Sequence, residues 1–140
     1  QMKNNKILIL GAGWYGCHIG LILKEKGYKI EIFEKGNDIF QGSSGRNQFR
    51  LHQGYHYPRS TITIQEAKKN FTKFIKKYKK FIKLPKHNIY CIAKNESLLD
   101  FGSYLNILDG NNLNFKQKKY KFLRNIEGSI NIKEGIVNGR

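Results

Sequence analysis

Lys6-Ile-Leu-Ile-Leu-Gly-Ala-Gly-Trp-Tyr-Gly16 is the stretch of this sequence that decides the fold. It opens with an apolar run short enough to be a buried parallel strand. Gly11, Gly13 and Gly16 follow in the G-x-G-x-x-G spacing. In that spacing the first glycine permits a tight turn, the second lets the backbone approach a pyrophosphate, and the third lets a helix pack closely on the strand. The stretch therefore predicts a dinucleotide-binding turn at the start of a helix.

A second strand and an acidic residue complete this pattern. Gly27 is placed to end the helix, and Lys29–Glu34 is expected to form the next strand. Glu34 then lies at the carboxyl end of that strand, where its side chain can accept hydrogen bonds from a ribose. A carboxylate there disfavours NADP, because it would meet the 2′-phosphate. The complete order favours dinucleotide binding over a βαβ unit whose glycines serve packing alone.

Length and composition set limits on the remaining hypotheses. The 140 residues suffice for one modest domain but are few for a nucleotide-binding domain plus a substrate domain. We expect Met2 to be the native start with no secretory leader before it, and no run approaches the roughly 18 apolar residues of a membrane span. The default expectation is therefore a cytoplasmic protein. Cys17 and Cys91 have no metal-ligand spacing, so we predict reduced core thiols and no metal site.

The chain is strongly basic, with a net charge of +16. Its lysines are spread along the sequence and no nucleic-acid motif is recognisable, so we predict no nucleic-acid partner. Attraction of an anionic substrate or of cofactor phosphates explains the positive charge more simply than a nucleic-acid partner does. The densest run, Ala67–Lys83, has apolar residues at helical spacing and predicts an amphipathic helix that ends before Pro85. A solvated lysine face is favoured there over a membrane-surface helix.

The second half of the sequence predicts a mixture of strands and helices. Ser97–Leu108 is expected to be a helix with Ser97 near its cap and Asp100 in its first turn. Asp109–Asn112 is expected to be a turn. The expected strands of this half are Asn88–Ala93, Tyr120–Leu123 and Gly135–Asn138.

The second strong signal is Gln41-Gly-Ser-Ser-Gly-Arg-Asn-Gln-Phe-Arg-Leu-His-Gln-Gly-Tyr-His-Tyr-Pro-Arg-Ser60. In this segment an asparagine, Asn47, is followed by His52, Gly54 and an aromatic pair. Together with the opening glycines, it resembles the FAD-dependent oxidoreductases of the D-amino acid oxidase type, the superfamily that includes glycine oxidase and 2-hydroxyglutarate oxidase. The resemblance implies FAD and a small-molecule substrate.

The same resemblance implies the fold class and the domains. We expect an α/β protein in which a Rossmann-like FAD-binding βαβ unit is followed by the beginning of an α+β substrate domain. Residues 1–84 would form the FAD-binding portion with the flavin loop and the basic helix. Residues 85–140 would form a partial substrate-domain segment.

The resemblance also implies which residues hold the cofactor. In that family the segment equivalent to Gln41–Ser60 runs past the pyrophosphate and along the isoalloxazine. Ser43 and Ser44 would therefore lie near the phosphates, and Arg46–Gly54 would line the flavin. The expected cofactor-binding residues are Gly11, Gly13, Trp14, Tyr15, Gly16, Glu34, Lys35, Ser43, Ser44, Arg46, Asn47 and His52.

Three residues of the loop are candidate catalytic residues. A flavin accepts a hydride at N5, so the protein has mainly to orient the substrate and tune the charge. Arg50 or His52 could place a cation beside the reduced flavin, and Arg50 could instead bind a substrate carboxylate bidentately. His56 could act as a base toward an alcohol, because an unperturbed histidine pKa lies near neutrality. The alternative is that both histidines are simply hydrogen-bonded within the loop.

The main hypothesis is FAD-dependent oxidation of a small amine or hydroxyl compound. The alternatives are a non-catalytic module that binds the adenine half of a nucleotide, and an NAD-dependent oxidoreductase. A parallel sheet built only from Lys6–Leu10 and Lys29–Glu34 would leave apolar surface and strand edges open. We therefore expect that the chain is part of a longer oxidoreductase, or that a second chain completes it, a second copy in a homo-oligomer included.

Overall fold

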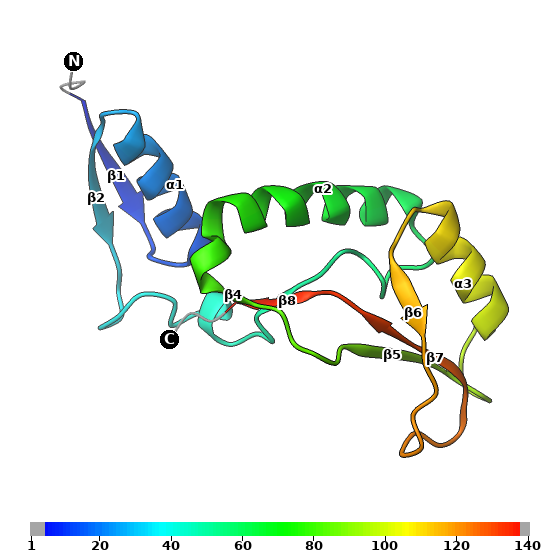
Figure 1. Cartoon of the computed structure of the whole chain (residues 1–140). Coiled ribbons are helices and arrows are strands. Elements are labelled where there is room, and N and C mark those ends of the chain that lie inside the picture. Colours follow the sequence, from blue (N-terminus) through cyan, green and yellow to red (C-terminus); the bar gives the residue numbers. More distant parts are fainter. Residues whose placement is uncertain (1–4, 138–140) are drawn as a thin grey trace. The chain divides into compact units, whose positions relative to one another are not determined.

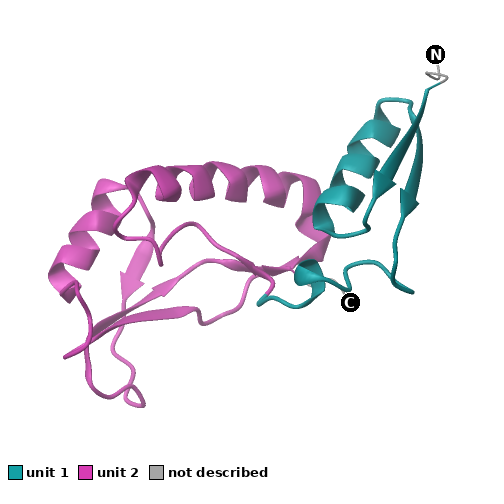
Figure 2. Ribbon diagram, turned by 180° about the vertical axis from the view of Figure 1, so that it is seen from behind, with its two compact units in different colours: residues 1–48 teal, residues 49–140 magenta. Residues whose placement is uncertain are grey.

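The computed structural model describes residues 5–137, which fold into two compact units. The first comprises Gln1–Gln48 and the second Phe49–Arg140 (Figure 2). This division is one of compactness, so the functional assignment of residues 1–84 and 85–140 stays a prediction.

The first unit contains the expected strand–helix–strand pattern. Strands β1 (Lys6–Leu10) and β2 (Lys29–Phe33) pair in parallel, in register from Lys6 opposite Lys29 to Leu10 opposite Phe33. Helix α1 (Trp14–Glu25) connects them (Figure 1). A Cβ built on Gly20 would lie 3.1–3.5 Å from side-chain atoms of Ile9, Ile30 and Ile32. Helix α1 therefore packs closely on the face of the sheet that carries these isoleucines.

Two glycines of the turn have the roles that the sequence predicts. Gly11 has φ +98°, a conformation that L side chains rarely adopt. A Cβ on Gly16 would lie 2.0 Å from the carbonyl oxygen of Gly11. The strand–helix approach is thus open only to glycine at position 16.

The first unit leaves much of its apolar surface exposed. Within residues 5–137, β1 and β2 form a sheet of two strands. Leu8 is 57% exposed, Leu10 85% and Phe33 53%. The open apolar surface expected from the sequence is therefore present.

The second unit is built on two antiparallel sheets. One has the order β3-β8-β4, from Arg50–Leu51, Gly135–Val137 and Ile82–Lys83. The other has the order β5-β7-β6, from Ile89–Ala93, Ile126–Ile132 and Phe115–Gln117. The mixed α/β architecture, a parallel β-α-β unit followed by antiparallel sheets, confirms the predicted fold class.

Two helices and strand β7 form the core of the second unit. Helix α2 (Thr61–Tyr78) contributes Ile64, and helix α3 (Phe101–Gly110) contributes Tyr104 and Leu108. The hydroxyl of Tyr104 donates to the carbonyl of Tyr55 at 2.9 Å. The buried apolar side chains are those of Tyr55, Ile64, Tyr104, Leu108, Leu113, Ile130 and Ile132.

The basic helix starts earlier than the sequence pattern predicts. Ser60 caps α2, because its Oγ accepts a hydrogen bond from the Thr63 N–H at 3.3 Å. The first turn contains β-branched residues of modest helix propensity, which hid this start. After α2, a 3₁₀ turn, η2 (Lys79–Phe81), leads directly into β4, so the predicted helix was too long at its end.

The predicted cap of α3 was also wrong. Asp100, not Ser97, is the N-cap, and its carboxylate accepts from the Ser103 N–H at 2.8 Å. Ser97 forms a local turn through its hydrogen bonds with Leu99. The helix continues to Gly110, two residues past the predicted end.

The predicted strands near the end were partly wrong. Residues 120–123 lie in the connection between β6 and β7 and form a turn, whereas the long strand β7 was not predicted. β8 confirms the last predicted strand as far as Val137, and Asn138 lies outside the described residues, as does Met2. Cys91 is exposed, so the prediction of a core thiol was wrong there.

Neither a membrane span nor a metal cluster is found in the described part of the chain. No helix there is long and apolar enough to cross a membrane. No group of three or more His, Cys, Asp or Glu side chains among residues 5–137 is arranged to hold a metal ion.

Candidate functional site

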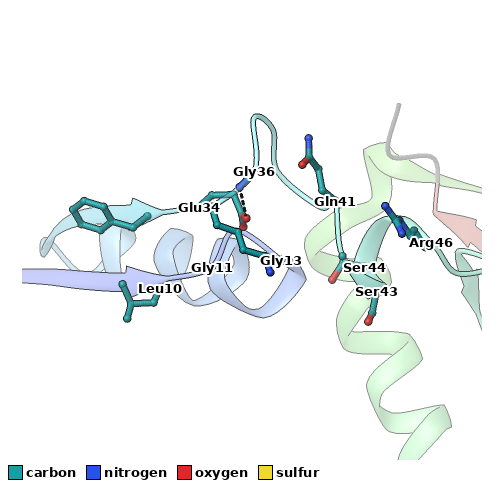
Figure 3. A pocket seen from close by; sticks show the side chains of 12 residues that line it. Leu10, Gly11, Gly13, Glu34, Gly36, Gln41, Ser43, Ser44 and Arg46 are labelled. Carbon is teal, nitrogen blue, oxygen red and sulfur yellow. Dashed lines mark hydrogen bonds between the residues drawn. The ribbon is translucent and has the colours of Figure 1, made fainter.

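A cavity of about 840 Å³ lies in the first unit, at the carboxyl ends of β1 and β2 (Figure 3). Its size is typical of a small-molecule site, and in open α/β sheets ligands bind outside the carboxyl ends of the strands. It is lined by Leu10, Gly11, Gly13, Phe33, Glu34, Lys35, Gly36, Gln41, Gly42, Ser43, Ser44 and Arg46.

The start of α1 makes one side of this cavity suited to an anion. The Trp14 N–H donates to Ser44 Oγ at 2.9 Å, which ties the short 3₁₀ turn η1 (Ser43–Gly45) to the helix start. The first turn of α1 carries no acidic side chain. Its N–H groups lack intrahelical acceptors and the helix dipole is positive at this end, so negative charge is favoured here.

Glu34 is held at the edge of the cavity by backbone donors. Its Oε2 accepts from the Ala12 N–H at 2.7 Å, and its Oε1 accepts from the Gly36 N–H at 3.0 Å. These hydrogen bonds, that from Gly36 first, lower the pKa of Glu34, so the side chain is ionised at neutral pH. A carboxylate has about four lone-pair sites, and those that remain can accept hydroxyl protons.

The polar residues after β2 complete the cavity. Lys35 and Arg46 bring positive charge to its lining. Asn47 supports this wall without lining it, because its Nδ2 donates to the carbonyls of Ser43 and Ser44 at 3.0 and 3.4 Å. The cavity therefore combines bare backbone, hydroxyls, two cations and one fixed carboxylate.

The predicted cofactor residues divide into those that line this cavity and those that do not. Trp14 stacks on His18 and Phe40, with ring centroids 6.3 and 6.1 Å apart, and Tyr15 is 79% exposed. His52 belongs to the second unit. The predicted residues that line the cavity are Gly11, Gly13, Glu34, Lys35, Ser43, Ser44 and Arg46.

Five further residues line the cavity and were not predicted. Leu10 and Phe33 end the two parallel strands, and that position alone could have indicated them. Gly36, Gln41 and Gly42 lie in the loop after β2, where no periodic pattern points to a ligand.

A second polar cluster lies in the second unit, and its hydrogen bonds involve two of the three predicted catalytic residues, Arg50 and His56. Arg50 Nη2 donates to Glu134 Oε2 at 2.7 Å and also to the hydroxyl of Tyr90. The Tyr90 hydroxyl lies 3.3 Å from Glu134 Oε2 and 3.3 Å from His56 Nδ1. Glu134 Oε1 accepts from the Gln53 N–H at 2.8 Å. The Glu134 side chain is fully buried, so its charge is compensated by these donors.

Aromatic rings pack around His56. The rings of His52 and His56 meet edge to face at 4.5 Å, and Tyr57 lies 4.1 Å from His56, measured between ring centroids. Within residues 5–137, the buried Nδ1 of His52 has no hydrogen-bond partner. The three predicted catalytic residues Arg50, His52 and His56 thus belong to one cluster.

The electrostatics of this cluster keep the Tyr90 hydroxyl protonated and the His56 ring neutral. Burial and the Glu134 carboxylate raise the pKa of Tyr90 to about 12. Partial burial, His52 and Arg50 lower the pKa of His56, and Glu134 opposes them. His56 is therefore neutral at pH 7.

Tyr90 and Glu134 were not predicted from the sequence. Glu134 is 84 residues from Arg50, and the pairing of β3 with β8 brings them together. The one signal in the sequence was an acid followed by glycine beside a predicted strand, which is common in turns.

A family model and two relatives found by comparison with known proteins are all described as FAD-dependent. The family model for FAD dependent oxidoreductases matches residues 6–113. The FAD-dependent monooxygenase FPY4 of Fusarium mangiferae is 32% identical over 131 residues, which are 92% of this chain and 36% of that protein. The FAD-dependent monooxygenase kojA of Aspergillus flavus is 39% identical over 93 residues, 66% of this chain and 22% of that protein.

The chain spans about a third or less of the length of these relatives. A shorter match, 40% identical over 47 residues, is to the tRNA 5-methylaminomethyl-2-thiouridine biosynthesis bifunctional protein MnmC of Marinomonas sp.. It covers 34% of this chain and 7% of that protein. No solved structure matches the chain.

Proposed function

The chain belongs to the FAD-dependent oxidoreductase family, and we propose that its first unit binds the adenosine diphosphate half of FAD in a protein that oxidises a small amine or hydroxyl compound. The observation that carries this proposal is the cavity at the ends of β1 and β2, where the glycine turn, the start of α1 and Glu34 meet. A pyrophosphate fits the turn and a ribose fits the carboxylate.

The backbone of the turn fits such a ligand in detail. A side chain on Gly11 would meet no atom within 4 Å, so the turn is open on this side. A Cβ on Gly13 would come 3.4 Å from Ser44 Oγ, which leaves backbone and hydroxyl groups side by side. A phosphate can therefore come close to the backbone here, beside the Ser44 hydroxyl that accepts from the Trp14 N–H.

Five charged or hydroxyl-bearing residues of the lining have a role in this proposal, and Asn47 supports them from outside the lining. Glu34 accepts hydrogen bonds from ribose hydroxyls, and its charge selects against a 2′-phosphate. Ser43 and Ser44 donate hydroxyl hydrogen bonds to phosphate oxygens, and Lys35 and Arg46 neutralise phosphate charge. Asn47 holds the serine turn in place through its two carbonyl contacts.

The second unit supplies the groups proposed for the substrate. FAD, when bound, accepts a hydride from the carbon that is oxidised. Arg50, His52 and His56 are the chain's own candidates for fixing charge and for taking the proton that leaves the substrate's oxygen or nitrogen. The basic chain favours an anionic substrate by long-range attraction.

The names of two relatives favour a second candidate reaction, monooxygenation. Both reactions begin with the same nucleotide site, and they differ in whether the product gains an oxygen atom from O₂. Turnover under ¹⁸O₂ separates them: incorporation supports monooxygenation, and an oxidised product without the label supports simple oxidation.

Nucleotide binding is the first test, because it does not require a known substrate. The chain is titrated with FAD, ADP and NADH and followed by flavin absorbance and thermal shift. Arg46→Met should weaken FAD and ADP binding about tenfold, the loss of one hydrogen-bonded charge or about 1.4 kcal/mol. Arg59→Met, an exposed arginine outside the cavity, is the matched control and should leave the affinities unchanged.

The outcomes separate the three functional hypotheses. FAD binding that weakens in Arg46→Met supports the proposal. ADP binding without any FAD binding supports a non-catalytic nucleotide module instead. Protection by NADH but not by FAD would overturn the proposal in favour of an NAD-dependent enzyme.

A further inference from the structure

We infer that Glu134 and Tyr90 are positioning residues that hold the proton of neutral His56 on Nδ1, so that Nε2 carries the lone pair that accepts the substrate's proton. The use of Nε2 as a base rests on the proposed function. The assignment of the proton to Nδ1 does not, because it follows from hydrogen bonds inside the second unit.

A series of hydrogen-bond contacts runs from His56 through Tyr90 and ends on Glu134. Glu134 Oε2 faces Arg50 Nη2 at 2.7 Å and the Tyr90 hydroxyl at 3.3 Å, and the same hydroxyl faces His56 Nδ1 at 3.3 Å. Glu134 Oε1 accepts a hydrogen bond from the Gln53 N–H at 2.8 Å. Three donors therefore converge on a fully buried carboxyl group, an arrangement suited to the ionised form, which only accepts.

Counting the donors along these contacts leaves one consistent direction for each hydrogen bond. The Tyr90 hydroxyl has a single proton and faces two groups that could accept it. Glu134 can only accept, whereas His56 Nδ1 can donate or accept according to its tautomer. Both contacts are hydrogen bonds only if Tyr90 donates to Glu134 and His56 Nδ1–H donates to Tyr90. The charge on Glu134 favours the same direction, because a charge-assisted hydrogen bond is the stronger one.

The contact of Arg50 with Tyr90 agrees with this direction. Arg50 Nη2 has two protons, of which one is given to Glu134 and the other to the Tyr90 oxygen. The Tyr90 oxygen then accepts from Arg50 and His56 and uses its own proton on Glu134. Each of these contacts then has one donor and one acceptor, without a conflict.

The charges that face His56 keep it in the form that can accept a proton. Partial burial, the ring of His52 and Arg50 on β3 disfavour a charged His56, and Glu134, in the short connection between β7 and β8, favours it. Tyr90 on β5 keeps its proton because its pKa is raised to about 12. Tyr57 contributes a packed ring. With the pKa of His56 below its ordinary value, the ring is neutral at pH 7.

This arrangement defines the proton step. The O–H or N–H bond of the substrate breaks, its electron pair stays on the heteroatom, and the proton forms a bond with Nε2 of His56. Before and after the transfer, the Nδ1–H of His56 donates to the Tyr90 oxygen, so no hydrogen bond has to reverse its direction. His56 is exposed at the surface of the second unit, so its ring is open to a ligand.

The same contacts change the role proposed for Arg50. One of its terminal nitrogens is fully used by Glu134 and Tyr90, and its charge is offset by a buried carboxylate. Arg50 is thus held as part of the positioning chain rather than as an isolated cation for a substrate carboxylate.

The tautomer of His56 can be measured directly. In the ¹⁵N-labelled chain at pH 7.5, long-range ¹H–¹⁵N correlation spectra distinguish the protonated ring nitrogen from the bare one by chemical shift. The His56 signals are identified among those of the four histidines by their loss in a His56→Asn variant. We expect Nδ1–H for His56 in the unmodified chain and a change to mainly Nε2–H in Tyr90→Phe and in Glu134→Met, which leaves the Tyr90 hydroxyl no acceptor at position 134.

A matched control and a second variant keep the test decisive. Tyr57→Phe removes a hydroxyl from the other tyrosine packed on His56 and should leave Nδ1–H in place. Tyr90→Phe keeps the ring, so it answers the question even if the buried Glu134→Met change unfolds the unit. Nε2–H in the unmodified chain, or Nδ1–H retained in Tyr90→Phe, overturns the inference. If the tautomer behaves as expected and FAD does not bind, the proposed function fails while the proton assignment stands.

Discussion

The two units of this chain build their sites in opposite ways. The first uses backbone groups at the end of a two-stranded sheet, and among residues 5–137 Ala12 is the one buried apolar side chain of this unit. The second buries a core of seven apolar side chains and attaches charged side chains to it. A backbone site depends on the absence of side chains, whereas a side-chain site depends on the packing behind it.

Core truncation should expose this difference most strongly. Leu108 is fully buried in α3, so Leu108→Ala should lower the free energy of unfolding by about 2–5 kcal/mol. Leu10→Ala, in the first unit, removes a side chain that is 85% exposed and should change it by less than about 0.5 kcal/mol. Urea titration followed by circular dichroism compares the two. Equal losses would mean that Leu10 is covered in solution, by a second copy for example.

A methyl group in the glycine turn should damage the first unit through geometry alone. Gly16→Ala would put a Cβ 2.0 Å from the Gly11 carbonyl oxygen, a strain of about 1–3 kcal/mol that the turn must absorb. We expect nucleotide affinity to fall about tenfold or more in an ADP titration. Gly110→Ala, at the end of α3 with no atom within 4 Å of its Cβ, is the control and should be neutral or slightly stabilising. Unchanged affinity in Gly16→Ala would show that the turn does not hold the nucleotide.

The same contrast explains how much the sequence could predict. The first unit was predicted well because its signals are local: Gly11, Gly16 and Glu34 lie within one strand–helix–strand segment, and each has a geometric reason. In the second unit, Glu134 reaches Arg50 only through the pairing of β3 with β8. Strand β7 pairs with two strands, the preceding β6 and the more distant β5, so its own residues gave a weaker signal than the alternation around Tyr120. Non-local pairing of this kind leaves little trace in a short window.

The pH dependence of nucleotide binding should distinguish a site based on Glu34 from one based on histidine. The folded-state pKa of Glu34 is depressed by backbone N–H groups of Gly36 and Ala12, so its charge is present above the ordinary glutamate pKa and is lost as the pH falls through the depressed value. The affinity for FAD, whose pyrophosphate diester lacks the terminal phosphate of ADP with its second pKa of about 6, should therefore be flat from pH 8 to pH 5 and fall only in more acid solution. In Glu34→Gln the acid fall should disappear. A loss of affinity centred near pH 6.5 would instead point to a histidine.

The smallest effect should come from the ion pair of the first unit. Lys6 Nζ lies 2.6 Å from Glu31 Oε1, but both side chains are about half exposed, so water and salt screen the pair. Lys6→Met should cost at most about 1 kcal/mol in urea unfolding at low salt and less at high salt. Arg50→Met leaves Glu134 buried without its cation, and loss of one partner from a buried pair costs about 3–5 kcal/mol. If the two substitutions cost the same, the Glu134 carboxylate is not shielded from water, and the argument that it orders the protons of Tyr90 and His56 loses its basis.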